Sequence, residues 1–184
     1  RDKPYEYLNL QLDILDKICG NVIVEIGSAR QPMNHPLDEI VPMCCTDGHS
    51  TFFWANSQKE TYTVDIANYG NILHGIKQQH PDTFNAYMGD GITFLDHFER
   101  KIDLLFLDAW DVEPGTQYAE NHLKAFNSAK DKLSDRHIIG IDDTDVFQGG
   151  KGRLIIPELQ KLNYHMVTDG RQTIFTNFDL KEVD

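Results

Sequence analysis

Acidic residues end two apolar runs in the second half of the chain, and they are the groups best suited to chemistry. Asp108 ends the run 102–108, and the pair Asp142 and Asp143 follows the run 137–141. Carboxylates gathered at neighbouring strand ends repel one another, so such a cluster needs a bound cation, a proton or nearby cationic groups. Oxygen-only ligands favour hard ions such as magnesium, calcium or manganese. The plainer alternative is that these acids cap helices and turns without a metal.

A second set of candidate residues lies at the ends of the first two expected strands. The apolar run 22–26 contains Glu25 and is stopped by Gly27, and the run 61–65 ends in Asp65. In open α/β sheets the ligand lies outside the carboxyl ends of the strands, and an acid after the second strand commonly holds a ribose. Glycine lets the backbone approach such a ligand closely. The alternatives are that Glu25 simply ends a strand and that Asp65 caps a helix.

The elements that would position these residues alternate between apolar runs and segments with helical spacing. Asp169-Gly-Arg171 separates the last two runs and indicates a hairpin. The pattern predicts one α/β domain over 1–184, with a Rossmann-like seven-stranded mostly parallel sheet, a C-terminal antiparallel hairpin and helices on both faces. The strands are expected at 22–26, 61–65, 84–88, 102–108, 137–141, 164–168 and 172–176. The helices are expected at 5–18, 69–80, 92–98, 117–133 and 153–162, with one more beginning near 52–55.

Three segments leave alternatives open. The leading helix 5–18 is expected either to pack on the sheet or to cover the site. Residues 29–47 have no apolar period and contain prolines, so they form either a tolerated surface insertion or a lid over the substrate. Pro157 falls inside the helix expected at 153–162, where it either kinks the helix or marks a later start.

The composition narrows the expected partners and compartment. The 184 residues carry a formal net charge of -12, which repels phosphate backbones, so no nucleic acid partner is expected. No apolar run reaches the roughly 18 residues that span a bilayer, so no membrane partner is expected either. The chain has 3 cysteines without CxxC spacing, which favours a reducing, cytoplasmic location over a disulfide framework. Because the chain begins with Arg1, we expect it to be trimmed or excised from a longer protein.

Four motifs, in this order, resemble those of the class I S-adenosylmethionine-dependent methyltransferases. Glu25-Ile-Gly27 resembles the first motif, and Asp47-Gly-His-Ser-Thr51 resembles its glycine-rich second half, displaced by the long loop. Asp65 matches the ribose-binding acid, and Gly89-Asp-Gly91 matches the segment that meets the adenine amino group. The NAD fingerprint GxGxxG is absent. The resemblance implies these cofactor-binding residues: Glu25, Gly27, Ser28, Gly48, Ser50, Asp65, Asp90, Gly91 and Asp108.

A narrower resemblance covers the acids of the second half. Phe106-Leu-Asp-Ala-Trp110 and Gly140-Ile-Asp-Asp143 are similar to the metal-binding segments of catechol O-methyltransferase and of the cephalosporin-hydroxylase-like group. The similarity implies one divalent ion, magnesium or manganese, which would orient an acceptor hydroxyl and lower its pKa. The implied metal ligands are Asp108, Asp142 and Asp143.

The same resemblance points to catalytic candidates. The catalytic lysine of catechol O-methyltransferase falls at Asp111, so that base is not preserved. Lys151, in the glycine-rich loop 149–152, is the candidate to approach the site instead. The catalytic candidates are therefore Asp108, Asp111 and Lys151. His122 is expected to be a surface or packing residue.

The expected function is S-adenosylmethionine-dependent transfer of a methyl group to a hydroxyl of a small molecule or saccharide, assisted by a divalent ion. The sulfonium is intrinsically reactive, so alignment of the acceptor supplies much of the rate. One alternative is a module that binds the cofactor but has lost chemistry. Another is a different Rossmann-type, nucleotide-dependent enzyme. A homo-oligomer is left open.

Overall fold

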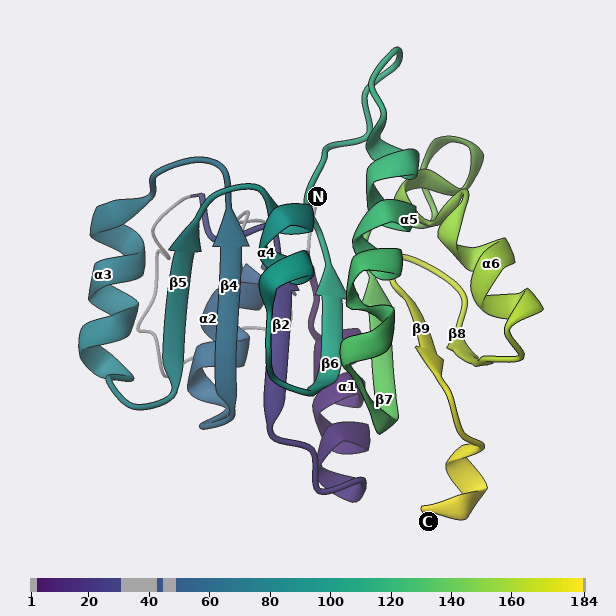
Figure 1. The fold of residues 1–184 in the computed structure, drawn as a ribbon, viewed down its shortest axis with the longest axis horizontal. Helices are drawn as coiled ribbons and strands as arrows, with labels where there is room; N and C mark the ends of the chain where they lie inside the picture. The colour runs from purple at the N-terminus through teal and green to yellow at the C-terminus, as the bar shows by residue number, and fades with distance from the viewer. Residues whose placement is uncertain (1–2, 31–42, 45–48, 184) are drawn as a thin grey trace.

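The computed structural model describes residues 3–30, 43–44 and 49–183, which form a seven-stranded sheet with helices on both faces (Figure 1). The strands lie in the order β5-β4-β2-β6-β7-β9-β8. The strands from β5 to β7 are parallel, and β9 is antiparallel to both β7 and β8. The predicted fold class is therefore confirmed. The strands are β2 (Val22–Ile26), β4 (Glu60–Asp65), β5 (Phe84–Met88), β6 (Ile102–Leu107), β7 (Leu133–Ile141), β8 (His165–Thr168) and β9 (Thr173–Thr176).

The helices lie close to their predicted positions. The predicted helix 117–133 ends earlier than expected, and the place of Pro157 in its helix is now defined. The predicted helix 117–133 ends at Ala129 and continues as a 3₁₀ turn, because the chain from Leu133 onward already pairs with β6. Pro157 lies in the first turn of its helix, where a missing N–H breaks no helical hydrogen bond. The helices are α1 (Tyr5–Lys17), α2 (His49–Asn56), α3 (Gly70–Gln79), α4 (Gly91–His97), α5 (Tyr118–Ala129) and α6 (Ile155–Lys161), with 3₁₀ turns η1 (Lys130–Lys132), η2 (Phe147–Gly152) and η3 (Leu180–Glu182).

A short pair of strands, which the sequence does not predict, lies apart from the main sheet. β1 (Lys3–Pro4) pairs in an antiparallel manner with β3 (Met43–Cys44). Strands of two residues are too short to show a period, so pattern reasoning does not detect them. The rest of the predicted loop, residues 31–42 and 45–47, lies outside the described residues, and its role as insertion or lid stays a prediction.

Alternation along the strands divides the core between the two faces of the sheet. Val24 and Ile26 of β2 join an apolar cluster that includes side chains of α4, α5 and α6. Ile23, which precedes Val24, points to the opposite face and joins a cluster with side chains of α1 and α2. Figure 1 shows α4 and α5 in front of the sheet and α1 and α2 behind it. The leading helix therefore packs on the sheet, which is the first of its two predicted roles.

The register of the parallel strands brings the candidate acids to one edge. A single row of paired residues crosses β4, β2, β6 and β7 at their carboxyl ends. The residues that follow this row are Asp65, Gly27, Asp108 and Asp142. The chain runs outward from β2 to β5 on one side and then from β6 to β7 on the other, so the strand order reverses between β2 and β6. Ligands of open α/β sheets bind at this reversal.

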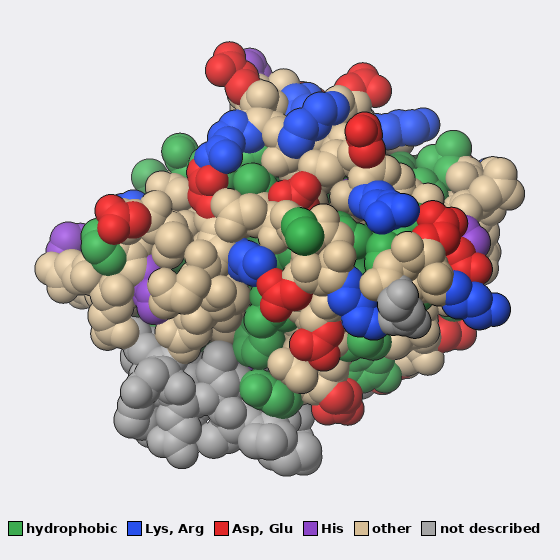
Figure 2. Space-filling model, turned by 90° about the horizontal axis from the view of Figure 1, so that it is seen from below, with side chains coloured by type: hydrophobic (Ala, Val, Ile, Leu, Met, Phe, Trp, Pro, Cys, Tyr) green, Lys and Arg blue, Asp and Glu red, His purple; other side chains and the backbone are tan. Residues whose placement is uncertain are grey.

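Neither a membrane-spanning helix nor a continuous basic surface is found in the parts of the structure that can be assessed, which are the described helices and the face drawn in Figure 2. No helix in the described ranges is both long and apolar enough to cross a bilayer. Figure 2 looks toward the amino ends of the parallel strands, and its described Lys and Arg side chains are interspersed with Asp and Glu. Such mixed charge gives a polyanion no continuous footprint on this face.

Candidate functional site

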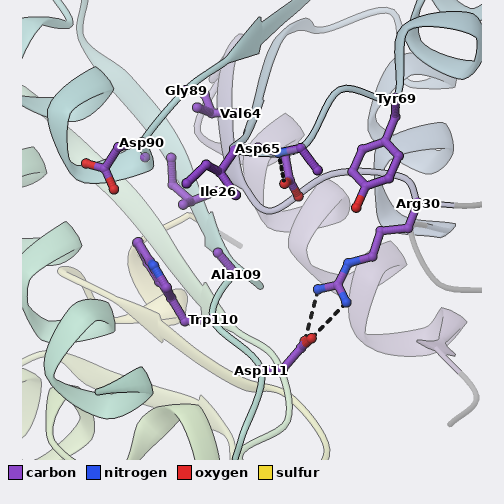
Figure 3. A pocket seen from close by; sticks show the side chains of 13 residues that line it. Ile26, Arg30, Val64, Asp65, Tyr69, Gly89, Asp90, Ala109, Trp110 and Asp111 are labelled. Carbon is purple, nitrogen blue, oxygen red and sulfur yellow. Dashed lines mark hydrogen bonds and ion pairs between the residues drawn. The ribbon is translucent and has the colours of Figure 1, made fainter. Parts of the chain in front are cut away.

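A cavity of about 320 Å³ opens at the carboxyl edge where the strand order reverses (Figure 3). Ile26, Val64 and Ala109 give it apolar lining, and Trp110 adds an aromatic wall. A mostly apolar cleft of this size with a few polar groups is typical of a small-molecule site. The sequence predicted a ligand at this edge, and the structure places a suitable cavity there.

Two of the carboxylates that line the cavity, Asp65 and Asp90, come from the ends of neighbouring strands, β4 and β5. Asp65 accepts hydrogen bonds from the backbone N–H groups of Ser28 (3.1 Å) and Ala67 (2.9 Å). These bonds fix the carboxylate and still leave acceptor capacity on both oxygens for a ligand hydroxyl pair. Asp90 caps α4 by accepting from the N–H of Thr93 at 2.8 Å, and Gly91 follows it in the lining. Asp90 therefore has a capping role in addition to its place in the cavity lining.

Gly27 shapes the cavity through its backbone. Its φ is +99°, a conformation that residues with a side chain rarely adopt. A Cβ at this position would lie 2.7 Å from the carbonyl carbon of Asp108. Gly27 therefore allows the loop after β2 to touch the loop after β6. It is not itself among the lining residues, and Ser28 contributes through the N–H that holds Asp65.

Glu25 lies behind the sheet rather than in the cavity. Its side chain is fully buried, and one oxygen accepts hydrogen bonds from the hydroxyls of Thr51 and Thr63, each at 2.7 Å. Strand alternation explains this position, because Ile26 faces the cavity and Glu25 faces α2. Ser50, another predicted cofactor residue, is also buried and adds a hydrogen bond to Glu25. Gly48 lies outside the described residues.

Burial has a large effect on the ionisation of Glu25. Removal from water raises the pKa of Glu25 to about 7, and the charge of Asp108 adds to this, although the hydroxyls of Thr51, Thr63 and Ser50 act in the opposite direction. Its second oxygen, Oε1, has no hydrogen-bond partner among the described residues. A proton is therefore retained near neutral pH because the buried negative charge is poorly compensated.

We predict a pH-dependent effect of Glu25→Gln on stability. The folded-state pKa of about 7 exceeds the unfolded value of 4.5, so the stabilisation linked to Glu25 is complete below pH 4.5 and is lost as pH rises through 7. The full loss is on the order of 3 kcal/mol. Glutamine does not titrate, so the variant should gain stability relative to wild type between pH 5 and pH 8. Urea unfolding at both pH values measures this, and parallel pH profiles for the two proteins would show that Glu25 is ionised throughout.

An ion pair crosses the mouth of the cavity. Both terminal nitrogens of the Arg30 guanidinium, Nη1 and Nη2, contact the carboxylate of Asp111, at 2.8 and 2.9 Å (Figure 3). The two side chains are 33% and 55% exposed, so the pair adds little to stability. Asp111, predicted as a catalytic candidate, is thus engaged by Arg30 at the cavity rim. Arg30 was not predicted, because the two residues are far apart in sequence and come from different loops.

The predicted acid cluster forms beside the cavity. Asp108, Asp142 and Asp143 each offer a carboxylate oxygen, and these oxygens lie within 4.8 Å of one another. The ammonium of Lys151 lies 2.6 Å from Oδ1 of Asp108 and 3.3 Å from Oδ2 of Asp143. Arg171 contacts one oxygen of each residue in the adjacent pair, Oδ2 of Asp142 (3.4 Å) and Oδ1 of Asp143 (3.1 Å). Nearby cationic groups, one of the alternatives open from sequence, are thus present beside the cluster.

A relay of amides fixes Asp142 from behind. Its side chain is 0% exposed, and Oδ1 accepts a hydrogen bond from the amide of Gln172 at 2.9 Å. Gln172 in turn accepts from the amide of Gln11 in α1 at 3.0 Å. Sequence reasoning missed Gln11, Arg171 and Gln172. Arg171 and Gln172 could have been found from the hairpin turn, because β9 is antiparallel to β7 and its start must meet the acids that follow β7.

Three of the six non-glycine residues with positive φ in the described part of the chain lie around the cavity and the cluster. Trp110, Asp143 and Gln148 have φ values of 48°, 51° and 55°. Such strain in non-glycine residues concentrates at functional sites. Trp110 lies edge-on against the ring of His122, with centroids 5.2 Å apart.

His122 supports the site from the core. It is fully buried, so it is a packing residue, and Nδ1–H donates to the carbonyl of Tyr118 at 2.6 Å. Burial lowers the pKa of His122 to about 3, and the charge of Lys151 acts in the same direction. The ring is therefore neutral near pH 7 and braces Trp110 without adding charge beside the cluster.

The sequence matches no protein-family profile and no curated protein, but solved structures share the fold. A protein described as a caffeoyl-CoA O-methyltransferase from Staphylococcus aureus has a TM-score of 0.59 at 14% identity, covering 93% of this chain and 82% of its own. An rRNA-methylase from Clostridium thermocellum has a TM-score of 0.55 at 12% identity, covering 92% of this chain and 95% of its own.

A further similar structure was solved with ligands. The methyltransferase MycE from the mycinamycin biosynthetic pathway, in complex with Mg, SAH and mycinamycin VI, has a TM-score of 0.60 at 14% identity. The match covers 92% of this chain but 48% of MycE, so this chain spans about half the length of that protein. At these identities the likeness concerns the fold. The chain therefore has the fold of the class I methyltransferases, as its sequence motifs predicted.

Proposed function

We propose that this chain transfers a methyl group from S-adenosylmethionine to a hydroxyl of a small molecule or saccharide. The observation that carries the proposal is the cavity at the strand reversal, lined by Asp65 and Asp90 in a methyltransferase fold. The similar structure of MycE contains the demethylated cofactor, SAH, which supports the choice of ligand. The formal charge of -12 continues to disfavour nucleic acid as the acceptor, although an rRNA-methylase shares the fold.

The residues that line the cavity fit this cofactor. Asp65, held by two backbone N–H groups, has acceptor capacity left for the ribose hydroxyls. Asp90 would accept from the adenine amino group, and Ile26, Val64 and Trp110 offer the apolar surface that a base requires. The cofactor supplies a reactive methyl group on a sulfonium. The chain would contribute alignment and exclusion of water.

Asp108 is the group we assign to the acceptor. In its pair with Lys151, the Asp108 side chain is 15% exposed and the lysine 2%, so an incoming hydroxyl meets the carboxylate first. Asp108 would accept the hydroxyl hydrogen bond and, as the new C–O bond forms and the C–S bond breaks, take the proton. Lys151 would hold the carboxylate in place and limit its movement. Ala109 and Trp110, the next residues, line the cavity, which places Asp108 beside the cofactor.

A divalent ion at Asp108, Asp142 and Asp143 stays a prediction from the sequence. The magnesium in the MycE complex supports it, and the three acids supply hard oxygen ligands. Their oxygens, however, already contact Lys151, Arg171 and Gln172. The residues present therefore do not fit an ion without displacing a cation. Cytoplasmic location and the oligomeric state are likewise predictions.

Calorimetry with S-adenosylhomocysteine and NAD tests the proposal against its rivals. One molecule of S-adenosylhomocysteine should bind per chain, and NAD should not compete. Transfer of a tritiated methyl group to a panel of diols and saccharides then separates an enzyme from a module that only binds the cofactor. Preference for NAD would favour a different Rossmann-type enzyme, and binding without turnover of any acceptor would favour the inactive module.

A further inference from the structure

We infer that the ammonium of Lys151 is a built-in cation that takes the place of a divalent ion in the acid cluster, with Arg171 as its partner. The inference rests on the geometry of the cluster and holds whatever acceptor is methylated. For the proposed function it means that methyl transfer needs no added metal. It assigns Lys151 a positioning role, because it acts through Asp108.

The contacts of Lys151 are those of a bound cation rather than of a surface side chain. The residue is 1% exposed, and three oxygens lie close to Nζ: Oδ1 of Asp108 (2.6 Å), the carbonyl of Asp108 (3.1 Å) and Oδ2 of Asp143 (3.3 Å). An ammonium has three N–H donors, and these oxygens can satisfy all of them. Burial of a charged lysine is costly unless such partners are present, so the site is built for a cation of this kind.

The loop that carries Lys151 has a backbone shaped to insert it. Gln148, Gly149 and Gly150 have consecutive positive φ values of 55°, 88° and 48°, which fold the chain back toward β7. A Cβ at Gly150 would collide with the carbonyl oxygen of Asp143. The N–H of Lys151 donates to that same carbonyl at 3.3 Å. The loop therefore clamps Lys151 by its backbone as well as by its ammonium.

The charges of the cluster leave little attraction for a second, divalent cation. Three carboxylates face one ammonium and one guanidinium, so the formal charge of the group is one negative unit. A divalent ion placed among them would repel both cations at short range. Asp142 is 0% exposed and held by Gln172 and Arg171, so it cannot turn toward an ion without breaking those bonds.

Manganese binding tests the inference without cofactor or acceptor. It is measured as the decrease in the electron paramagnetic resonance signal of the free ion when manganese is added to the protein. Wild type should not bind manganese with a dissociation constant below about 1 mM. Lys151→Met leaves three carboxylates facing one guanidinium and should tighten manganese binding by at least about tenfold. Manganese should also raise the Tm of this variant but not that of wild type. Lys161→Met, which removes a lysine with a 74% exposed side chain from the surface, is the matched control and should behave as wild type.

A second variant covers the case in which Lys151→Met fails to fold. Lys151→Met with Asp143→Asn keeps the formal charge of the wild-type cluster, so it should fold. Because no ammonium then occupies the position beside Asp108 and repels an ion, and the asparagine still offers one oxygen, the variant should also gain a manganese site. Stoichiometric binding to wild type that Asp108→Asn abolishes would overturn the inference in favour of a metal site. If neither wild type nor the folded variant binds, the cluster is no cation site and the inference is also wrong. If the protein transferred no methyl group, the proposed function would be wrong, but the expected manganese-binding results for wild type and the variants would stay the same.

Discussion

Gly27→Ala should lower the free energy of unfolding by about 3 kcal/mol. The backbone of Gly27 has a φ of +99°, and the new Cβ would lie 2.7 Å from both the carbonyl carbon and the oxygen of Asp108. The contacts are with backbone, so no flexible side chain can move aside. The overlap between the new Cβ and the backbone of Asp108 can be removed only if β2 and β6 separate at their carboxyl ends, where the cavity lies.

Urea unfolding with a matched glycine variant measures this effect. Gly75 lies inside α3, and a Cβ there would meet nothing within 4 Å. Gly75→Ala should therefore stabilise the protein by about 0.5–1 kcal/mol, since alanine favours the helix. Opposite signs for the two variants are the expected result. A Gly27→Ala protein as stable as wild type would mean that the two loops do not approach each other as described.

Asp65→Ala should weaken the binding of S-adenosylhomocysteine by about 1.5–3 kcal/mol, or roughly 10- to 150-fold. The variant removes the carboxylate that we assign to the ribose hydroxyls. It also releases the backbone N–H groups of Ser28 and Ala67, so circular dichroism must first establish that the variant is folded. Calorimetry then gives the affinity.

Asp82→Ala is the matched control for that experiment. Asp82 lies in the exposed turn between α3 and β5, and its loss changes the net charge by the same amount. Its affinity for S-adenosylhomocysteine should equal that of wild type. If a folded Asp65→Ala variant also binds as wild type does, the ribose does not lie on Asp65 and the placement of the cofactor is wrong.

The architecture was predictable because apolar runs report burial directly. The central strands β2 and β6 are buried, so their runs of Val, Ile, Leu and Phe are visible in sequence, whereas the edge strand β5 buries only Phe84. The row of strand ends then follows from register, which is why Asp65, Asp108 and Asp142 were correctly gathered at one edge. The direction of individual side chains was harder to foresee. Glu25 was assigned to the ligand, yet period-two alternation along β2 turns it away from the cavity toward Thr51.

The partners of the acids were not predictable, because they come from distant parts of the chain. Arg30 and Asp111 belong to loops after different strands, and Gln11 reaches Gln172 from the opposite end of the sequence. Such pairs depend on loop conformations that no local pattern records. The approach of Lys151 was anticipated from its glycine-rich loop, but its burial among the acids was not. A crowded acid cluster in a sequence therefore does not distinguish a metal ion from an internal ammonium.

A crystal structure with bound S-adenosylhomocysteine tests the central claim most directly. The account predicts cofactor density across the cavity between β4, β2 and β6, with the ribose hydroxyls on Asp65, the adenine amino group near Asp90, and the sulfur end directed toward Asp108. Density at another place, or no binding in crystals that accept another nucleotide in this cavity, would contradict the assignment of the site to methyl transfer.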